Sequence, residues 1–268
     1  MDQIWADLPR VWARKALKKV GLPATPEVGV LGSAVRKLRN QIESDLGLDL
    51  HVSNALLTTT HLIAFYEDDA EDICEYAGIE HIRPQIYMAP PLWETAAAYA
   101  GYGQGLCDHF QNETLCNYEN RNVLPTNKIM AVHYSRAALT VSYATLQPAT
   151  WLFEPTVFRR DNFSLGGDTI SGYSNQDQYW QDVKSALLDV MVDTPTLPKP
   201  SFLILTGDDL ATGYFLQYLR EVMQGHLGYA PFIYFDDARL AAARGAAELR
   251  RRTSYRKKFP WEKWSAVP

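Results

Sequence analysis

Two apolar strands joined by a tight turn, "KIMAVHYSRAALTVSYATL" at residues 128–146, constrain the fold of this chain more than any other stretch. Over residues 139–145, Leu139, Val141, Tyr143 and Thr145 alternate with Thr140, Ser142 and Ala144, which predicts a strand with two distinct faces. A hairpin of this layout often holds a phosphate, whose oxygens bind backbone N–H groups at the turn. Here the turn residues are Ser135, Arg136 and Ala137, although a phosphate-binding turn favours glycine.

Further strand and helix patterns alternate along the rest of the chain. Apolar residues recur every three or four positions from Glu27 to Gly47, which predicts a helix with one buried face and a glycine stop. Other helix patterns lie at residues 67–78, 174–191 and 236–252, and a helix follows the strand "FLILTG" at 202–207. Shorter strand patterns lie at residues 52–66, 82–88 and 231–235. Strands that alternate with helices predict an α/β protein.

One predicted helix is unusual in composition. The segment "WETAAAYAGYGQGL" at residues 93–106 begins as a helix made mostly of alanine and glycine. The glycines lower the intrinsic helix propensity of the segment. Alanine and glycine together allow another backbone to approach closely. We therefore expect this helix to pack tightly against a neighbouring element.

Composition limits the class of protein. Of the 268 residues, 47% are hydrophobic and 21% are charged, as is ordinary for a globular protein. The formal net charge of −5 gives no reason to expect nucleic acid as a partner. No run of about 18 apolar residues is present, so we expect no membrane span. Residues 1–19 form an amphipathic basic segment rather than a secretory signal, which predicts a docked helix, with a targeting peptide as the less favoured alternative.

The cysteines and the start of the chain together predict a compartment. The three cysteines, Cys74, Cys107 and Cys116, are odd in number and show no metal-binding spacing. Without a secretory signal, we expect reduced thiols and a cytoplasmic protein. The glycosylation acceptor patterns "NET" at Asn112 and "NFS" at Asn162 carry no meaning under that expectation.

Six segments, in order, resemble a known family. They are similar to segments of the ATPase domain shared by heat-shock chaperones, actin and sugar kinases: residues 28–61, the acidic helix segment 67–79, "WETAAAYAGYG", "FSLGGD", "LILTGDD" and "DDARLAAARGAAE". In chaperones the third and fourth segments take forms such as "EPTAAAIAYG" and "THLGGED". The resemblance covers roughly residues 27–252 and omits the first 25. It is also shared with uncharacterised chaperone-like proteins of filamentous fungi.

The resemblance implies a two-lobe, actin-like fold that lacks the first phosphate-binding strands. On this register residues 1–127 are a remnant of the first lobe with an N-terminal helical segment, and residues 128–268 are a ribonuclease-H-like second lobe. The shortened sheet of the first lobe would have a new edge, covered by the N-terminal segment or by a second copy of the chain. The second case would make the protein a homodimer.

The opening hairpin then corresponds to the family's second phosphate-binding hairpin, "IFDLGGGTFDVSI" in chaperones. His133 replaces an acidic residue, the turn Ser135–Ala137 replaces three glycines, and Thr140 replaces an aspartate. The glycines are needed because a β-carbon would obstruct the approach of phosphate oxygens to backbone N–H groups. Gly207 keeps one glycine of the adenosine-contacting turn, but Asp208 replaces the next. We therefore expect no ATP hydrolysis, no cofactor and no metal.

Residues of the degenerate nucleotide cleft are the candidate site. If the cleft persists, it offers hydrogen-bond donors, one guanidinium and aromatic surface, which suit an apolar ligand with a carbonyl or carboxylate. The candidates for catalysis are Arg136, His133 and Tyr134. The candidates for substrate binding are Tyr99, Tyr102, Ser135, Gly207 and Asp208.

Each candidate also has a purely structural interpretation. His133 could be a hydrogen-bonded structural histidine, and Arg136 could point into water. Tyr99 and Tyr102 could be packing residues. The other histidines singled out, His61 and His109, have no partner in the sequence pattern and are interpreted as structural, and the run "DDAED" at 68–72 is interpreted as an exposed acidic helix start.

Two functions fit these patterns. The first is a cofactor-independent cyclase of pericyclic, Diels–Alder-like type that acts on a hydrophobic terpenoid or polyketide intermediate of secondary metabolism. Such a reaction needs a shaped pocket and one or two donors to a carbonyl. The alternative is a non-catalytic pseudo-ATPase that serves as a binding or regulatory scaffold. The enzyme is favoured on analogy alone, because no catalytic motif is present.

Overall fold

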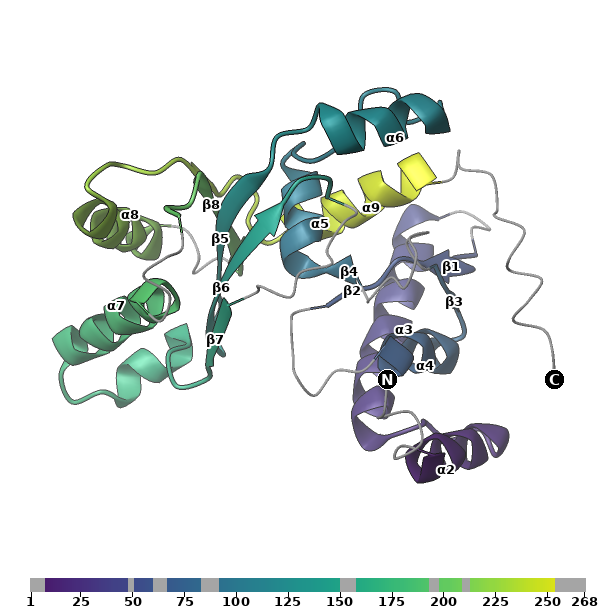
Figure 1. Ribbon diagram of the computed structural model, residues 1–268. Helices are drawn as coiled ribbons and strands as arrows, with labels where there is room; N and C mark the ends of the chain where they lie inside the picture. Colours follow the sequence, from purple (N-terminus) through teal and green to yellow (C-terminus); the bar gives the residue numbers. More distant parts are fainter. Residues whose placement is uncertain are drawn as a thin grey trace. The chain divides into compact units, whose positions relative to one another are not determined.

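The computed structural model describes residues 8–47, 51–59, 67–82, 92–149, 158–192, 198–208 and 213–253 (Figure 1). The chain divides into two units, residues 1–83 and 84–268, which are described in turn. Helices and a mixed sheet make it an α/β protein, as the alternating patterns predict. In the described part of the chain, no helix combines the length and the apolar character needed to cross a lipid bilayer.

The first unit is mainly helical. Its elements are α2 (Leu8–Lys19), α3 (Pro26–Leu46), β1 (Asn54–Ala55), β2 (Thr58–Thr59), α4 (Glu67–Ala77) and β3 (Glu80–His81), and β1 pairs in parallel with β3. Thr25 caps α3 by accepting a hydrogen bond from the Val28 amide at 3.2 Å, and Gly47 ends the helix with a left-handed φ of 58°. The predicted helix at 27–47 is confirmed, because its start and stop residues act as such residues usually do.

The N-terminal helix docks on the acidic helix through ion pairs. Arg14 of α2 donates to Asp69 at 2.6 Å and to Asp72 at 2.8 Å, and Lys18 contacts Asp72 at 2.6 Å. Asp72 is buried, so the interpretation of residues 68–72 as an exposed helix start is wrong for this residue. A buried carboxylate is stable there because Arg14 neutralises it and satisfies its hydrogen bonds. The docked helix expected near the N-terminus is confirmed.

The second unit contains a five-stranded sheet. Its elements are β4 (Leu92–Trp93), α5 (Glu94–Gly101), α6 (Glu113–Asn122), β5 (Asn127–Tyr134), β6 (Leu139–Leu146), β7 (Phe158–Asn162), the 3-10 helix η1 (Gly167–Gly172), α7 (Gln176–Val192), β8 (Phe202–Gly207), α8 (Tyr214–Leu227), β9 (Ile233–Tyr234) and α9 (Ala241–Thr253). The strand order is β7-β6-β5-β8-β9. The pairs β7–β6 and β6–β5 are antiparallel, and β5–β8 and β8–β9 are parallel.

Helices cover both faces of this sheet (Figure 1). Alternate side chains of β5 and β8, among them Met130, Val132 and Leu205, join the core formed with α7 and α8. On the other face, α5 packs on β8, where Tyr99 stacks on Phe202 with ring centroids 6.1 Å apart. The predicted hairpin is confirmed. Its second strand is buried on both faces, however, so the expected contrast between two faces of β6 is largely absent.

Helices α5 and α9 cross with almost no space between their backbones. A β-carbon added to Gly101 would lie 2.0 Å from the Ala241 carbonyl oxygen, and one added to Gly245 would lie 1.6 Å from the Ala97 carbonyl oxygen. Both distances are far inside van der Waals contact, so neither glycine can be replaced without moving a helix. The expectation that the alanine–glycine helix accepts a close neighbour is confirmed.

The crossing also affects the division of the chain. The predicted lobe boundary lies at 127/128, whereas the second unit already begins at residue 84. Residues 92–101 belong with the C-terminal helix because α5 packs against α9 and β8.

Two of the shorter predicted strands can be compared only in part. Within the predicted strand at 52–66, residues 54–55 and 58–59 are strands, and residues 60–66 lie outside the described residues. Residues 83–88 of the next predicted strand also lie outside the described residues.

Replacing Gly245 by alanine should destabilise the protein by about 3 kcal/mol or more, because the new methyl group forces the two helices apart. The matched control is Gly225→Ala in α8, where nothing lies within 4 Å of the added β-carbon. That control should gain roughly 0.5–1 kcal/mol from helix propensity. Urea unfolding measures both free energies, and equal stability of the two variants would contradict the close crossing.

Candidate functional site

Most of the predicted site residues lie at the carboxyl ends of β5 and β8. These neighbouring strands run in parallel, and His133 and Tyr134 are in register with Thr206 and Gly207. Beyond this edge β5 continues to β6 on one side, while β8 continues to α8 and β9 on the other. Ligands of open α/β sheets commonly bind where the strand order reverses in this way. The candidate site is therefore this edge of the sheet.

The hairpin turn is held rigidly by its own backbone and by a glycine-containing loop. The Ser135 amide donates to the Ala138 carbonyl at 3.0 Å, and the Gly167 amide donates to the Ser135 carbonyl at 2.9 Å. Gly166 lies against the turn so closely that a β-carbon there would be 2.4 Å from the Arg136 carbonyl oxygen. The loop "FSLGGD" thus supports the turn from behind, and glycine is required for the contact.

Asp208 fills the position in front of the turn. Its carboxylate accepts a hydrogen bond from the Arg136 backbone amide at 2.8 Å. The preceding Gly207 has a φ of 131°, and a β-carbon on it would lie 1.9 Å from the Tyr134 carbonyl oxygen. The glycine lets the end of β8 pass close to β5, and Asp208 can then reach the turn. A backbone N–H that could bind an external anion binds an internal one instead.

The Arg136 side chain points away from the protein interior. It is 70% exposed, and its Nε donates to the carboxylate of Asp168 at 3.0 Å. The Asp168 amide in turn donates to the Arg136 carbonyl at 3.0 Å. The alternative interpretation, in which the Arg136 side chain points into water, therefore agrees with the structure. The exposed guanidinium also pairs with the Asp168 carboxylate. An exposed pair of this kind contributes little to stability.

His133 takes part in a polar cluster that the sequence patterns do not reveal. Its Nδ1 lies 3.0 Å from Oε1 of Glu94 and 3.2 Å from Oγ1 of Thr206. The side chains of His133 and Glu94 are 27% and 19% exposed. Glu94 is the first residue of α5, and Thr206 is the register partner of His133 on β8. The only sequence signal for Glu94 was an acidic residue at the start of the alanine-rich helix.

The pair shifts the pKa of both partners. Burial alone would lower the pKa of His133, but the hydrogen bond and charge of Glu94, with Asp208 nearby, raise it above its ordinary value. Burial would raise the pKa of Glu94, yet the hydrogen bond and charge of His133 lower it. Opposite shifts of this kind favour an imidazolium paired with a carboxylate. The cluster could donate a proton or a charged hydrogen bond near the sheet edge.

Of the three candidate tyrosines, Tyr99 and Tyr134 are buried in the second unit, and Tyr102 is half-buried. Tyr134 is buried, stacks on Phe215 with centroids 3.9 Å apart, and places its hydroxyl 3.1 Å from that of Tyr179. Tyr99 is fully buried and accepts a hydrogen bond from Asn127 at 2.8 Å. Tyr102 donates to the Leu205 carbonyl at 3.3 Å, and burial raises the pKa of its phenol to about 12. These contacts agree with the packing interpretation of Tyr99 and Tyr102.

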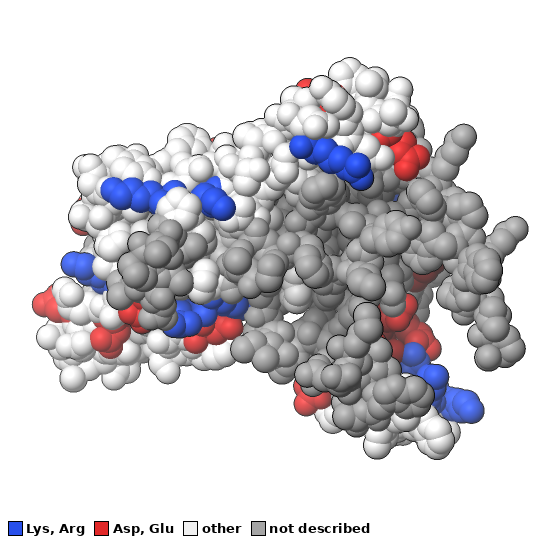
Figure 2. All heavy atoms as spheres, viewed as in Figure 1, with Lys and Arg blue, Asp and Glu red and all other residues white. Residues whose placement is uncertain are grey.

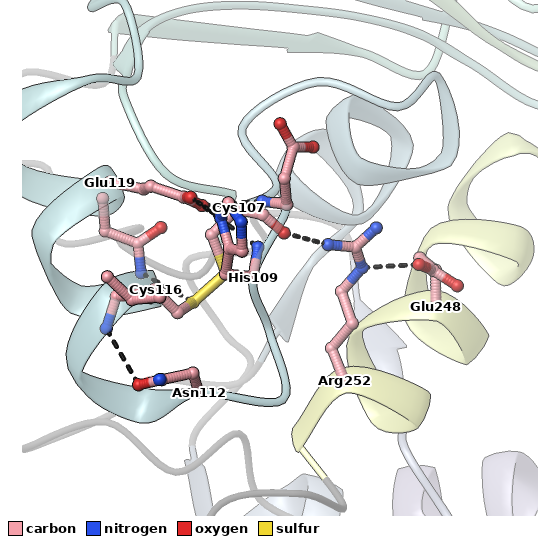
Figure 3. Close-up of a disulfide and its surroundings, with 10 residues drawn as sticks. Cys107, His109, Asn112, Cys116, Glu119, Glu248 and Arg252 are labelled. Atoms are coloured by element: carbon pink, nitrogen blue, oxygen red, sulfur yellow. Dashed lines mark hydrogen bonds and ion pairs between the residues drawn. A yellow bond between two sulfur atoms is a disulfide. The ribbon is translucent and has the colours of Figure 1, made fainter.

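A disulfide joins Cys107 to Cys116, so the expectation of three reduced cysteines is wrong for these two (Figure 3). Both cysteines are buried, and Cys116 lies in the first turn of α6. His109, expected to lack a partner, pairs through its Nδ1 with Glu119 of α6. His61 lies outside the described residues. The nine-residue spacing of Cys107 and Cys116 was the only available signal for the disulfide.

The surface carries charges of both signs. Figure 2 shows acidic and basic side chains interspersed over the described part of one face. This distribution agrees with the near-neutral composition and gives no electrostatic footprint of a nucleic-acid-binding surface on that face.

The search of protein-family models finds none that matches this chain, and the search of curated proteins finds no match either.

The His133–Glu94 pair makes a testable prediction about pH. The pKa of His133 is higher in the folded protein than in the unfolded chain, where it is near 6.5. The pair therefore stabilises the folded state fully below pH 6.5, and this stabilisation is lost as pH rises through the folded-state pKa. NMR titration of the His133 ring should give a midpoint above 6.5, and Glu94→Gln should lower it. We also expect Glu94→Gln to cost roughly 1–3 kcal/mol below pH 6.5, less at higher pH.

The control for this titration is Glu221→Gln, which removes an exposed carboxylate of α8. It should leave the His133 midpoint unchanged. A midpoint at or below the ordinary histidine value in the wild-type protein would show that Glu94 does not hold the imidazolium.

Proposed function

We propose that this chain is a pseudo-ATPase-like binding scaffold, in which the site of a nucleotide phosphate is occupied by the protein's own Asp208. The observation that carries the proposal is the 2.8 Å hydrogen bond from the Arg136 amide to the Asp208 carboxylate. A phosphate at the turn would need that N–H group and would meet a negative charge beside it. The proposal rests on the chaperone-like resemblance for the ancestry of the site.

The sheet supports this ancestry. A meander of three antiparallel strands, β5, β6 and β7, is followed on the other side of β5 by the parallel strands β8 and β9. Helices connect β7 to β8 and β8 to β9. This is the arrangement that a ribonuclease-H-like second lobe would have. The complete two-lobe, actin-like fold remains part of the proposal.

The hydrogen bonds around the turn support a static rather than a catalytic role. The Ser135 amide binds Ala138, the Arg136 amide binds Asp208, and the carbonyls of both residues accept amides from the supporting loop. Opening the turn to a ligand would break several of these bonds together. A turn with its polar groups satisfied internally is suited to keep one shape and to present a fixed surface to a partner.

Removal of Asp208 should uncover an anion site. In Asp208→Ala the Arg136 amide loses its acceptor, and phosphate should replace it. At ten times the dissociation constant, phosphate would stabilise the variant by about 1.4 kcal/mol, a rise in Tm of roughly 2–4 °C over chloride of equal ionic strength. Thermal unfolding should show no such difference for the wild-type protein or for Asp189→Ala on the exposed side of α7.

Calorimetric titration of the wild-type protein with Mg-ATP tests the same proposal directly. We expect neither binding heat nor phosphate release, because the cradle is already occupied. Stoichiometric binding of ATP by the wild-type chain would overturn the proposal.

The second candidate is the cofactor-free cyclase, and one observation favours it. His133 is partly exposed at the sheet edge and is held by Glu94 with a raised pKa. An imidazolium so placed could donate to a substrate carbonyl and stabilise charge that develops during cyclisation. The buried hydroxyl of Tyr134 has no such access, and Arg136 would have to leave Asp168 to assist.

Metabolite profiling after deletion of the gene distinguishes the two candidates. The cyclase predicts that one compound disappears while an isomer of identical mass accumulates. Complementation with His133→Ala should then restore the product about 100-fold less efficiently than wild type, since acid catalysis commonly contributes 10²–10⁴. His226→Ala, which alters an exposed histidine of α8, is the matched control. An unchanged metabolite profile would leave the scaffold as the supported function.

A further inference from the structure

The segment between α5 and α6 is a closed and well-anchored loop (Figure 3). The disulfide Cys107–Cys116 closes it, and both cysteines are buried. Oε2 of Glu119 accepts from the backbone amides of Asp108 at 2.7 Å and His109 at 3.3 Å. Arg252 of α9 donates to the Cys107 carbonyl. The disulfide is thus integrated into the fold of the second unit.

The pairing of the cysteines leaves no competing partner in the described chain. Cys74 is buried in α4 of the first unit, and burial raises the pKa of its thiol to about 11. A thiol of this kind forms little thiolate and exchanges slowly with disulfides. The odd cysteine count therefore resolves into one bridge and one inert thiol. A buried bridge of this type is characteristic of proteins that mature in an oxidising compartment.

The same loop contains a complete acceptor sequence for N-linked glycosylation, Asn112-Glu113-Thr114. Asn112 and Thr114 are both exposed. From the coincidence of the disulfide with this exposed acceptor, we infer that the chain matures in an oxidising, glycosylating compartment and that Asn112 carries an N-linked glycan. This inference is independent of the proposed scaffold function and replaces the cytoplasmic expectation.

The local geometry of Asn112 is compatible with the modification. Its side-chain oxygen Oδ1 caps α6 by accepting from the Leu115 amide at 3.2 Å, whereas a glycan is attached to the nitrogen Nδ2. In that step a new bond joins Nδ2 to C1 of a lipid-pyrophosphate-linked oligosaccharide. The C1–O bond to pyrophosphate breaks, and Nδ2 gives up one proton. The capping oxygen keeps its lone pairs, so the helix start survives.

The second acceptor sequence, Asn162-Phe163-Ser164, is less suitable. Asn162 is half-buried at the end of β7, where it is in register with Leu139 of β6. Its side-chain oxygen accepts from the Ser164 amide at 2.9 Å, and its carbonyl accepts from the Leu165 amide at 3.4 Å. A glycan there would crowd the sheet and the loop that supports the hairpin turn. Asn162 therefore serves as the internal comparison.

The test uses the full chain isolated from the organism that makes it. Treatment with peptide N-glycosidase should increase its electrophoretic mobility, and mass spectrometry should find Asp at position 112 in the released peptide. Asn112→Asp and Thr114→Ala should both abolish the shift. Asn112→Asp is informative because aspartate caps a helix as well as asparagine does, so the fold is kept. Glu113→Gln, which preserves the acceptor sequence, should retain the shift.

Non-reducing peptide mapping on the same sample completes the test. We expect one peptide pair linked through Cys107 and Cys116, and free Cys74. An unmodified Asn112 would overturn the inference, whether or not the disulfide is present. A glycan on Asn162 in place of Asn112 would overturn the choice of site, and reduced Cys107 and Cys116 would overturn the compartment.

Discussion

The contact between helices α5 and α9 is the constraint on which the second unit depends. At Ala97, Gly101, Ala241 and Gly245 the two backbones meet without side chains between them. This contact fixes α5 beside β8, where Tyr99 and Tyr102 lock it with a ring contact and a hydrogen bond. The start of α5 is thereby placed at the carboxyl end of the sheet, within reach of His133. The polar cluster is a consequence of helix packing as much as of its own chemistry.

The hairpin turn and the end of β8 form one physical unit. The carboxylate of Asp208 accepts the backbone N–H group of Arg136, which could otherwise bind an external anion. The need of this N–H group for an acceptor is therefore met within the chain. The proposed scaffold function rests on this interaction.

Sequence patterns predicted the elements better than their contacts. The helix at 27–47, the hairpin and the close-packing helix followed from periodicity and residue size, which are local properties. Glu94 could not be assigned to His133, because 39 residues separate them and only the packing of α5 brings them together. The burial of Asp72 depended on a distant arginine, Arg14. In both cases the missing information was tertiary.

The disulfide shows the same limit in another form. The expectation of reduced thiols rested on the lack of a secretory signal pattern, which says nothing about which cysteines lie close together in the fold. The structure separates them into an inert thiol in one unit and a bridge in the other. Which cysteines could meet depended on the path of the chain between α5 and α6, and no local pattern encodes that path.

The attachment of the disulfide loop to α9 has a mechanical consequence. Arg251 and Arg252, in the last turn of α9, both lie over the ring of Phe110, at 4.6 and 4.8 Å from its centroid. A force that pulls on the chain beyond α9 would first load these stacking contacts and the bond from Arg252 to the Cys107 carbonyl. The covalent ring closed by Cys107 and Cys116 cannot extend under that load. Force would therefore pass through the loop into α5 and α6, the helices that it connects.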